Sequence, residues 1–271
     1  VSRKGGVYGV TAGLVKKFGY KRVFDSPLDE TSIIGFGIGF GMNGYIPIIE
    51  IQFLAYFHNA EDQLRGEAST LSFFSNRKFS NPMIIRVPGL AYQKGFGGHF
   101  HNDNSLSIFK DIPGIIVAVP SNGEDAVKMM RTVVKEAYLN QRIIIFVEPI
   151  ALYNQKDLYE KKDGLWTKPY PNINENINLS EYGLFGSGNE LTIISYGNGF
   201  YLSMKSKRKI EQKIHKKIKI IDLRWLTDIN YSKLIKEIEQ SKKILIVDEC
   251  RKSGCFGESI FNNISSSING I

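Results

Sequence analysis

The stretch "GIIVAVPSNGEDAVKMMRTVVKEAYLNQRIIIFVEP", residues 114–149, decides the fold. It begins and ends with continuous apolar runs rich in β-branched residues, which are typical of strands buried on both faces. Between these runs the sequence predicts a helix over 122–138, with Ser121 or Asn122 as its N-cap. A strand, a helix and a second strand in this order indicate a parallel α/β sheet covered by helices.

The same alternation continues on both sides of this stretch. Further strands are expected from similar apolar runs at 46–53, 82–87, 191–197, 218–223 and 243–249. A helix is expected over 59–74, ahead of the strand at 82–87. The protein is therefore expected to be built of α/β units along most of its length.

Residues 151–190 interrupt the alternation. They are polar and contain prolines and several asparagines, so we expect a linker that crosses a surface. We therefore expect two α/β domains, over 1–150 and 191–271, joined by a linker over 151–190. The chain begins with Val1 and ends in "SSSINGI" without a closing strand, so we expect truncation at both ends and an incomplete second domain.

Composition limits the classes of function. No run of 18 uncharged apolar residues occurs, which argues against a membrane span. The net charge of +8 suggests nucleic acid as a partner, but eight basic residues cluster in 205–219 with a single acid, Glu211. Their helical spacing without aromatic residues favours a solvated helix face, with a polyanion or acidic protein as the alternative partner. We expect neither a nucleic-acid nor a membrane partner.

The two cysteines, Cys250 and Cys255, give no disulfide framework, and their spacing fits neither a redox motif nor paired zinc ligands. We interpret both as structural. A reducing compartment is expected, either a bacterial cytoplasm or an organelle matrix, and secretion is not.

The glycine string "GFGIGFGMNG", residues 35–44, invites comparison with a dinucleotide-binding loop. Its spacing differs from that fingerprint, and it follows a polar turn where the fingerprint follows a buried strand. In a helix, Gly37 and Gly41 would share one face and let another backbone approach closely. Tight helix packing is therefore favoured over phosphate binding.

The string "GGHFHND", residues 97–103, raises the possibility of a metal site. Two histidines at alternate positions of an extended segment, His99 and His101, would face the same way. A hydrolase with two metal ions needs further histidines, but position 104 is Asn and the only downstream histidine is His215, in the lysine-rich stretch. We therefore expect no metal ligands here.

The turn "FDSPLDE", residues 24–30, leaves Glu30 at the start of the glycine-rich helix. Taken alone, Glu30 is explained as an acid that interacts favourably with the helix dipole.

Several blocks, read together in their order, resemble one family. These blocks are "KGGVYGVTAGLVKKFGYKRVFDSPLDE", "EIQFLAYFHNAEDQL", "NPMIIRVPG", "HNDNSLSIFKDIPGIIVAVPSNGEDAVKMM" and "FVEPIALY". They resemble the β subunit of the thiamin-dependent, decarboxylating component of 2-oxoacid dehydrogenase complexes, the pyruvate and branched-chain types. The strings "IIDLRWLTDIN" and "ILIVDECRKSGCFGESI" are similar to its C-terminal, transketolase-type domain. The resemblance implies two transketolase-type domains, the first of them pyrimidine-binding.

The resemblance also implies roles for residues near the cofactor. Glu30 would hydrogen-bond to the aminopyrimidine ring of thiamin diphosphate and favour the tautomer that removes the proton from the thiazolium ring. Leu28 matches a position beside the cofactor, and Gln52 and Tyr56 match positions that flank the aminopyrimidine. Cofactor binding is therefore expected at Leu28, Glu30, Gln52 and Tyr56, with Glu30 also catalytic.

His101 matches the histidine that opens a His-Ser-Gln-Ser segment in the family, although here the segment reads His-Asn-Asp-Asn. The resemblance implies that its imidazole donates or accepts a proton when the acyl group passes to a lipoyl group. His99 has no counterpart, and we interpret it as structural.

The Gly-Asp-Gly motif through which thiamin enzymes hold the diphosphate and magnesium does not occur; the nearest string is Lys162-Asp163-Gly164. The resemblance therefore implies that an α subunit, or a fused α region, supplies the Mg²⁺ site. Expected partners are this α component, a second β copy, a lipoyl-bearing acyltransferase and a small 2-oxoacid. Two alternatives stay open: another thiamin-dependent transketolase-type enzyme, and a non-catalytic assembly subunit with the same fold.

Overall fold

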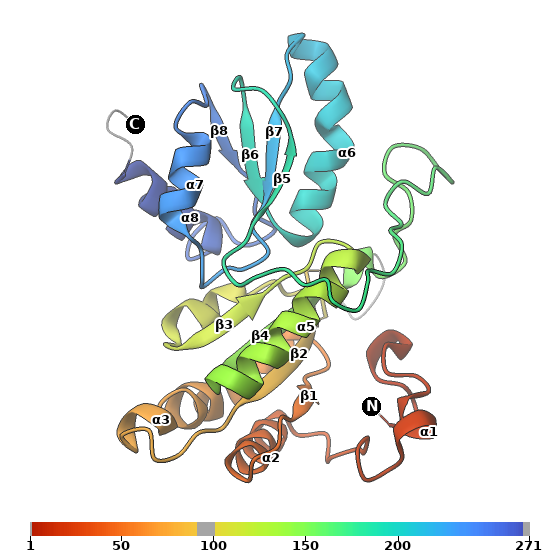
Figure 1. Ribbon diagram of the computed structural model, residues 1–271, viewed down its shortest axis with the longest axis vertical. Helices are drawn as coiled ribbons and strands as arrows, with labels where there is room; N and C mark the ends of the chain where they lie inside the picture. Colours follow the sequence, from red (N-terminus) through yellow and green to blue (C-terminus); the bar gives the residue numbers. More distant parts are fainter. Residues whose placement is uncertain (1, 91–100, 268–271) are drawn as a thin grey trace.

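The computed structural model describes residues 2–90 and 101–267 and contains two four-stranded sheets (Figure 1). The first sheet has the order β1-β2-β4-β3 and is parallel throughout. Its strands are β1 (Ile48–Glu50), β2 (Met83–Gly89), β3 (Ile115–Ala118) and β4 (Ile143–Pro149). All four lie within the expected runs or differ from them by two residues, and β2, β3 and β4 are buried along their whole length.

Helical segments surround the first sheet. They are η1 (Val7–Gly9), α1 (Leu14–Phe18), α2 (Glu30–Met42), η2 (Leu54–Ala60), η3 (Gln63–Ala68), α3 (Leu71–Phe74), η4 (Leu106–Asp111), α5 (Gly123–Asn140) and η5 (Ile150–Leu152). The segment 59–74, predicted as a helix, is helical, but it is divided between η2, the π-helical η3 and the short α3. Ser69 and Thr70 donate their hydroxyls to the carbonyls of Arg65 and Gly66, and such bonds compete with regular helix geometry.

The N-terminus of α5 is capped by one of the two residues expected there. The Asn122 side chain accepts a hydrogen bond from the Asp125 amide at 2.9 Å. Ser121 instead donates its hydroxyl to Asp222, which belongs to the second domain.

The glycines of α2 pack as expected from their spacing. A Cβ atom on Gly41 would lie 2.8 Å from the backbone carbon of Asn81 and 2.9 Å from the Pro82 oxygen. A Cβ atom on Gly37 would lie 3.1 Å from the Ile49 side chain and 3.2 Å from the Met83 sulfur. Gly35 and Gly39, by contrast, border open space.

The second sheet has the order β5-β7-β6-β8 (Figure 1). Its strands are β5 (Gly183–Gly186), β6 (Thr192–Ser195), β7 (Lys219–Asp222) and β8 (Ile244–Ile246), and its helices are α6 (Gly197–Ile214), α7 (Tyr231–Ile238) and α8 (Phe256–Ser265). Only β5 is antiparallel to its neighbour, β7. This strand falls inside the stretch predicted as a linker. Two of its four residues are glycines, so the sequence has no apolar run there that would predict a strand.

The segment between the sheets is anchored by buried side chains. Trp166 packs edge-on against Tyr201 of α6, with ring centroids 4.9 Å apart, and Leu158 joins the same cluster. Ile177 packs in a different cluster, with Trp225. The boundaries at 150 and 190 stay predictions, but this segment contributes to the core of both domains.

The two domains are joined by backbone hydrogen bonds. The segment after β7 runs antiparallel to the edge of β3, where the Val119 amide donates to the Arg224 carbonyl at 2.7 Å. The Leu226 amide donates to the Val117 carbonyl at 2.8 Å. One apolar cluster is continuous from residues of the first sheet to Ile221, Leu226 and Phe256.

A carboxyl group is buried at this junction. Asp222 accepts the Ser121 hydroxyl at 2.8 Å through Oδ1, while its Oδ2 is buried without a hydrogen-bond partner among the residues described. Burial, reinforced by the charge of Asp125, raises the pKa of Asp222 to about 8. Arg224 binds Asp125 at 2.8 Å and only partly offsets this effect.

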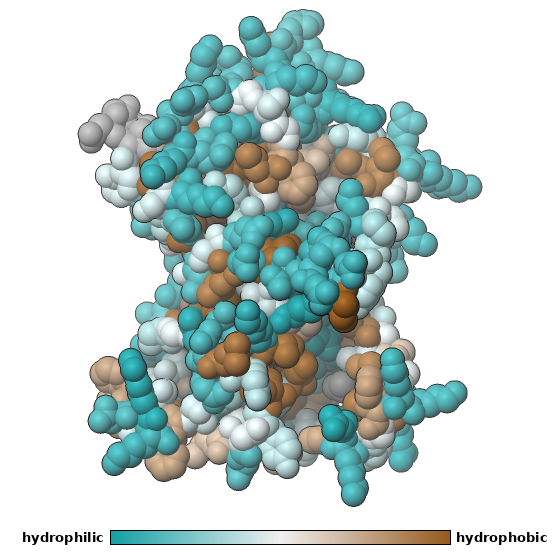
Figure 2. All heavy atoms as spheres, viewed as in Figure 1, coloured by the Kyte–Doolittle hydropathy of each residue, from teal (hydrophilic) through white to brown (hydrophobic). Residues whose placement is uncertain are grey.

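The basic stretch lies on and just after α6. Figure 2 shows hydrophilic side chains gathered over the end of the molecule where α6 meets β7. Lys207 pairs with Glu211, the one acid of the stretch, and Lys217 lies 3.5 Å from the same carboxylate. Among the helices described, none is long and apolar enough to cross a membrane.

Replacing Gly41 with alanine is expected to lower the free energy of unfolding by about 1–3 kcal/mol, because the added methyl group would collide with backbone atoms. Gly39→Ala is the matched control: its methyl group meets open space, so better helix propensity should stabilise the chain by up to about 1 kcal/mol. Urea unfolding of both variants measures the difference. Equal effects of the two substitutions would contradict the packing described for α2.

Asp222→Asn is expected to remove a pH dependence of stability. The folded chain binds the Asp222 proton more tightly than the unfolded chain, so wild-type stability should fall relative to the variant as pH rises from 3.8 to about 8. The slope is at most about 1.4 kcal/mol per pH unit. Unfolding curves at several pH values test this. The control is Asp111→Asn, at an exposed position, whose free energy of unfolding should fall with rising pH as in wild type. If the free energies of unfolding of wild type and Asp222→Asn changed in parallel with pH, Asp222 would not be the source of the pH dependence.

Candidate functional site

The predicted site residues lie around the segment that follows β1. Parallel strands place functional residues at their carboxyl ends. Gln52 lies two residues after the end of β1 and is half-buried, and Tyr56 lies on η2. The site is therefore built where the chain leaves the first sheet.

Glu30 is the first residue of α2, and its carboxylate is not used for capping. The Asp29 side chain caps the helix by accepting from the Ser32 amide at 2.9 Å. Hydrogen bonds from the Ser32 hydroxyl and from this amide lower the pKa of Asp29. The Glu30 carboxylate instead accepts a hydrogen bond of 3.4 Å from the side-chain amide of Asn59, on η2.

A second bond fixes the same two elements to each other. The Thr31 hydroxyl donates to the Asn59 carbonyl at 2.8 Å. The start of α2 and the end of η2 are therefore held side by side. Glu30 is half-buried at this contact.

Tyr56 and His101 are in direct contact. The Tyr56 hydroxyl lies 3.2 Å from His101 Nε2, and the two rings are nearly perpendicular, with centroids 5.6 Å apart. Phe53 packs against His101 edge-on, at 4.5 Å between centroids. Three rings thus meet beside η2, and the imidazole is held on two sides.

Not every predicted residue joins this group. Leu28 is 79% exposed on the turn before α2. His99 lies outside the described residues. Sequence reasoning missed Phe53 and Asn59, although both stand in the block "EIQFLAYFHNAEDQL", which contributed to the family resemblance.

A buried charge cluster lies in the strands that carry the site. Arg86 of β2 binds Glu148 of β4 through Nε at 2.6 Å and Glu50 of β1 through Nη1 at 3.0 Å. Burial alone would lower the pKa of Arg86, but the hydrogen bonds and charge of Glu148, with the charge of Glu50, raise it. Tyr153 donates to Glu148 at 2.6 Å, and burial together with this carboxylate raises the pKa of Tyr153.

The segment that follows His101 is bound to the second domain. Asp103 pairs with Arg251 at 2.8 Å, and the Asn104 amide group donates to the Glu249 carbonyl at 3.0 Å. The Cys250 thiol donates to the Asn104 carbonyl at 3.0 Å, and burial raises the pKa of Cys250. Cys250 therefore keeps its proton at neutral pH, in agreement with a structural role.

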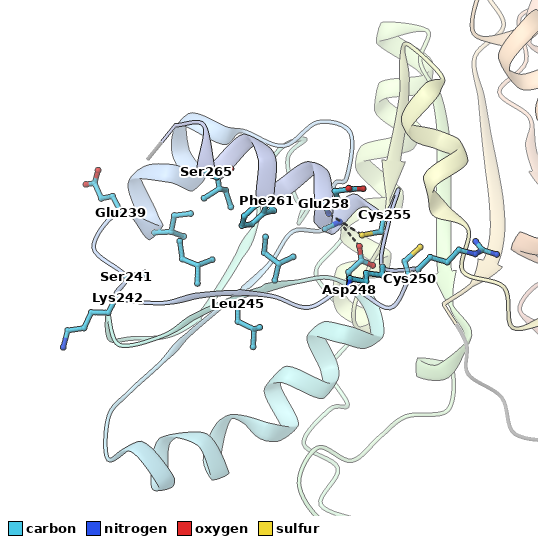
Figure 3. Close-up of a pocket in the computed structure, with 17 residues that line it drawn as sticks. Glu239, Ser241, Lys242, Leu245, Asp248, Cys250, Cys255, Glu258, Phe261 and Ser265 are labelled. Atoms are coloured by element: carbon cyan, nitrogen blue, oxygen red, sulfur yellow. Dashed lines mark hydrogen bonds between the residues drawn. The ribbon is translucent and has the colours of Figure 1, made fainter. Parts of the chain in front are cut away.

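A groove of about 730 Å³ runs along β8 and α8 in the second domain. Figure 3 shows Asp248, Cys250 and Cys255 at one end of it, in the loop between these two elements. None of the predicted site residues lines this groove. Among the residues described, no group of three metal-ligating side chains is placed to hold an ion.

Two protein-family models match the chain. The pyrimidine-binding domain of transketolase matches residues 2–155, and the transketolase C-terminal domain matches residues 185–270. A solved structure titled "Split gene transketolase, inactive beta4 tetramer" superposes with a TM-score of 0.72 at 14% identity, covering 96% of this chain and 76% of that one. This likeness concerns the fold.

Curated relatives are similar over nearly the whole chain. The 2-oxoisovalerate dehydrogenase subunit beta of Pseudomonas aeruginosa is 30% identical, over 95% of this chain and 73% of its own length. The corresponding subunit of Bacillus subtilis is 29% identical, over 99% and 76%. The pyruvate dehydrogenase E1 component subunit beta of Bacillus subtilis is 28% identical over the same shares of the two chains.

Arg86→Met is expected to lower the free energy of unfolding by about 3–5 kcal/mol, because it leaves Glu50 and Glu148 buried without their shared cation. The loss should be smaller at pH 5 than at pH 8, since unpaired carboxylates can take up protons. Arg65→Met, which removes an exposed pair with Asp111, is the control and should cost less than about 1 kcal/mol. Thermal unfolding at both pH values checks this; a loss as small as that of the control would be incompatible with the cluster.

Proposed function

The chain belongs to the transketolase-type family of 2-oxoacid dehydrogenase β subunits, and on this premise we propose that it is the β component of a thiamin-diphosphate-dependent decarboxylating dehydrogenase. The enzyme oxidatively decarboxylates a small 2-oxoacid and passes the acyl group to a lipoyl-bearing acyltransferase. The observation that carries this proposal is the carboxylate of Glu30 at the start of α2, tied to the element that holds Tyr56 against His101.

These residues fit the aminopyrimidine half of the cofactor. The Glu30 carboxyl group does not cap its own helix, because Asp29 does, so it is free to hydrogen-bond to a ring nitrogen and favour the protonated form of that nitrogen. Gln52 supplies an amide and Tyr56 an aromatic face next to the same segment. Leu28 adds apolar surface on the turn before α2. An aminopyrimidine needs this combination of one carboxylate and flat apolar contacts.

Thiamin diphosphate, when bound, supplies the nucleophilic carbon and the electron sink for decarboxylation. Glu30 holds the aminopyrimidine in the tautomer that makes this carbon reactive. Tyr56 orients His101 through its hydroxyl, and Phe53 fixes the plane of the imidazole ring. His101 then moves a proton as the acyl group passes to the lipoyl group.

The other half of the site is assigned to an α subunit or a fused α region, which would hold the diphosphate and Mg²⁺. Several apolar side chains support an interface beside Glu30. Exposed apolar side chains on α2 and the segments flanking it include Phe24, Leu28, Phe36, Phe40, Met42 and Tyr45. Gly35 and Gly39 leave room there for close approach of another element. A second β copy completes the proposed assembly, and the free thiols of Cys250 and Cys255 support a reducing compartment.

Glu30→Gln is expected to reduce 2-oxoacid-dependent reduction of an artificial electron acceptor at least about 100-fold, because an amide can neither give a proton to the ring nitrogen nor stabilise its positive charge. The chain is assayed with its α-type partner, thiamin diphosphate and Mg²⁺, with pyruvate and branched-chain acids side by side. Glu67→Gln, an exposed acid on η3, is the charge-matched control and should keep wild-type activity.

Retained turnover in Glu30→Gln would overturn the role of Glu30. No turnover of any 2-oxoacid by the wild-type complex would reject the dehydrogenase proposal, and transfer to a sugar aldehyde would then identify a different thiamin-dependent enzyme.

A further inference from the structure

The second domain holds the chain segment that carries His101. Residues 103–105 follow this histidine, and each of them is bound to the loop between β8 and α8, about 145 positions away in the sequence. Asp103 accepts from Arg251 Nη2 at 2.8 Å, and Arg251 Nη1 donates to the Ser105 hydroxyl. One guanidinium therefore spans two residues of the segment from the opposite domain.

Neighbouring contacts reinforce this attachment. The Asn104 side chain donates to the Glu249 carbonyl, and the Asn104 carbonyl accepts from the Cys250 thiol, both at 3.0 Å. Lys110, at the end of η4, donates to the carbonyls of Gly254 and Cys255 at 3.1 and 3.0 Å. The loop of the second domain thus contacts the segment at both of its ends, at residues 103–105 and at Lys110.

Asp103 also faces the first domain. His58 Nε2 of η2 lies 3.8 Å from its second carboxylate oxygen, and His58 Nδ1 lies 3.6 Å from Glu61. Asp103 therefore stands between η2, which carries Tyr56, and the loop of the second domain, which carries Arg251. Its own side chain is only 19% exposed, whereas those of Arg251 and His58 are 64% and 46% exposed.

We propose that Arg251 is a positioning residue for His101: through Asp103 and Ser105 it aligns the histidine segment against Tyr56 for proton transfer. The inference rests on the proposed function of His101. A partly exposed ion pair adds little to stability, typically less than about 1 kcal/mol. Its effect is on geometry, because a displacement of about 1 Å at a reacting group can slow a reaction roughly 100-fold.

The test compares two rates in the complete complex with its α-type partner, thiamin diphosphate and Mg²⁺. One rate is reduction of an artificial acceptor, and the other is acylation of a lipoyl-bearing domain, the step assigned to His101. Arg251→Met should lower the ratio of acylation to acceptor reduction at least about tenfold, in the same direction as His101→Ala. Arg251→Lys keeps the charge but cannot bridge Asp103 and Ser105. Its ratio of acylation to acceptor reduction should therefore lie between that of wild type and that of Arg251→Met.

Lys252→Met is the matched control, since it removes the next positive charge of the same exposed loop, and its ratio should stay within about twofold of wild type. An unchanged ratio in Arg251→Met, or an equal fall of both rates, would overturn the positioning role. A wild-type complex without 2-oxoacid-dependent acceptor reduction would instead reject the proposed function. In that case amide hydrogen exchange over 101–110 still tests the attachment: faster exchange in Arg251→Met supports it, and unchanged exchange overturns it.

Discussion

The backbone pairing between β3 and the segment after β7 is the constraint on which the rest of the structure depends. An edge strand exposes a row of unpaired amides and carbonyls, and here the second domain takes up part of that row through the bonds at Val117 and Val119. Because backbone atoms make these bonds, the relative placement of the two sheets does not vary with flexible side chains. The loop after β8 consequently meets the segment after His101 in a fixed register.

Buried carboxyl groups are accommodated in two different ways in two places, the first sheet and the domain junction. In the first sheet, Glu50 and Glu148 share the guanidinium of Arg86 with good hydrogen-bond geometry. At the domain junction, the neighbouring acid Asp125 takes Arg224, and Asp222 is left in an environment that favours its protonated form. The first arrangement is a paired cluster of charges, whereas the second makes the stability of the domain junction depend on pH.

Seven strands follow from the sequence because continuous β-branched runs have few alternatives to a buried strand. The eighth, β5, does not, since "GLFG" pairs only because β7 offers an edge beside it. Among site residues, Glu30, Tyr56 and His101 come from blocks resembling a family, and their roles stay predictions. Asn59 and Phe53 were missed although they lie in one of these blocks. The contact of Asp103 with Arg251 joins positions too far apart for any local pattern to reveal.

The glycines of α2 have a further consequence for how the protein folds. Four of its 13 residues are glycine, and each lowers intrinsic helix stability by about 1 kcal/mol relative to alanine. An isolated segment of this composition would not nucleate a helix in water. The helix must therefore form while docking on β2, and the carboxylate at its first residue has no defined position until the sheet beneath it exists. Binding competence at this end of the protein thus arises late in folding, as a product of tertiary structure.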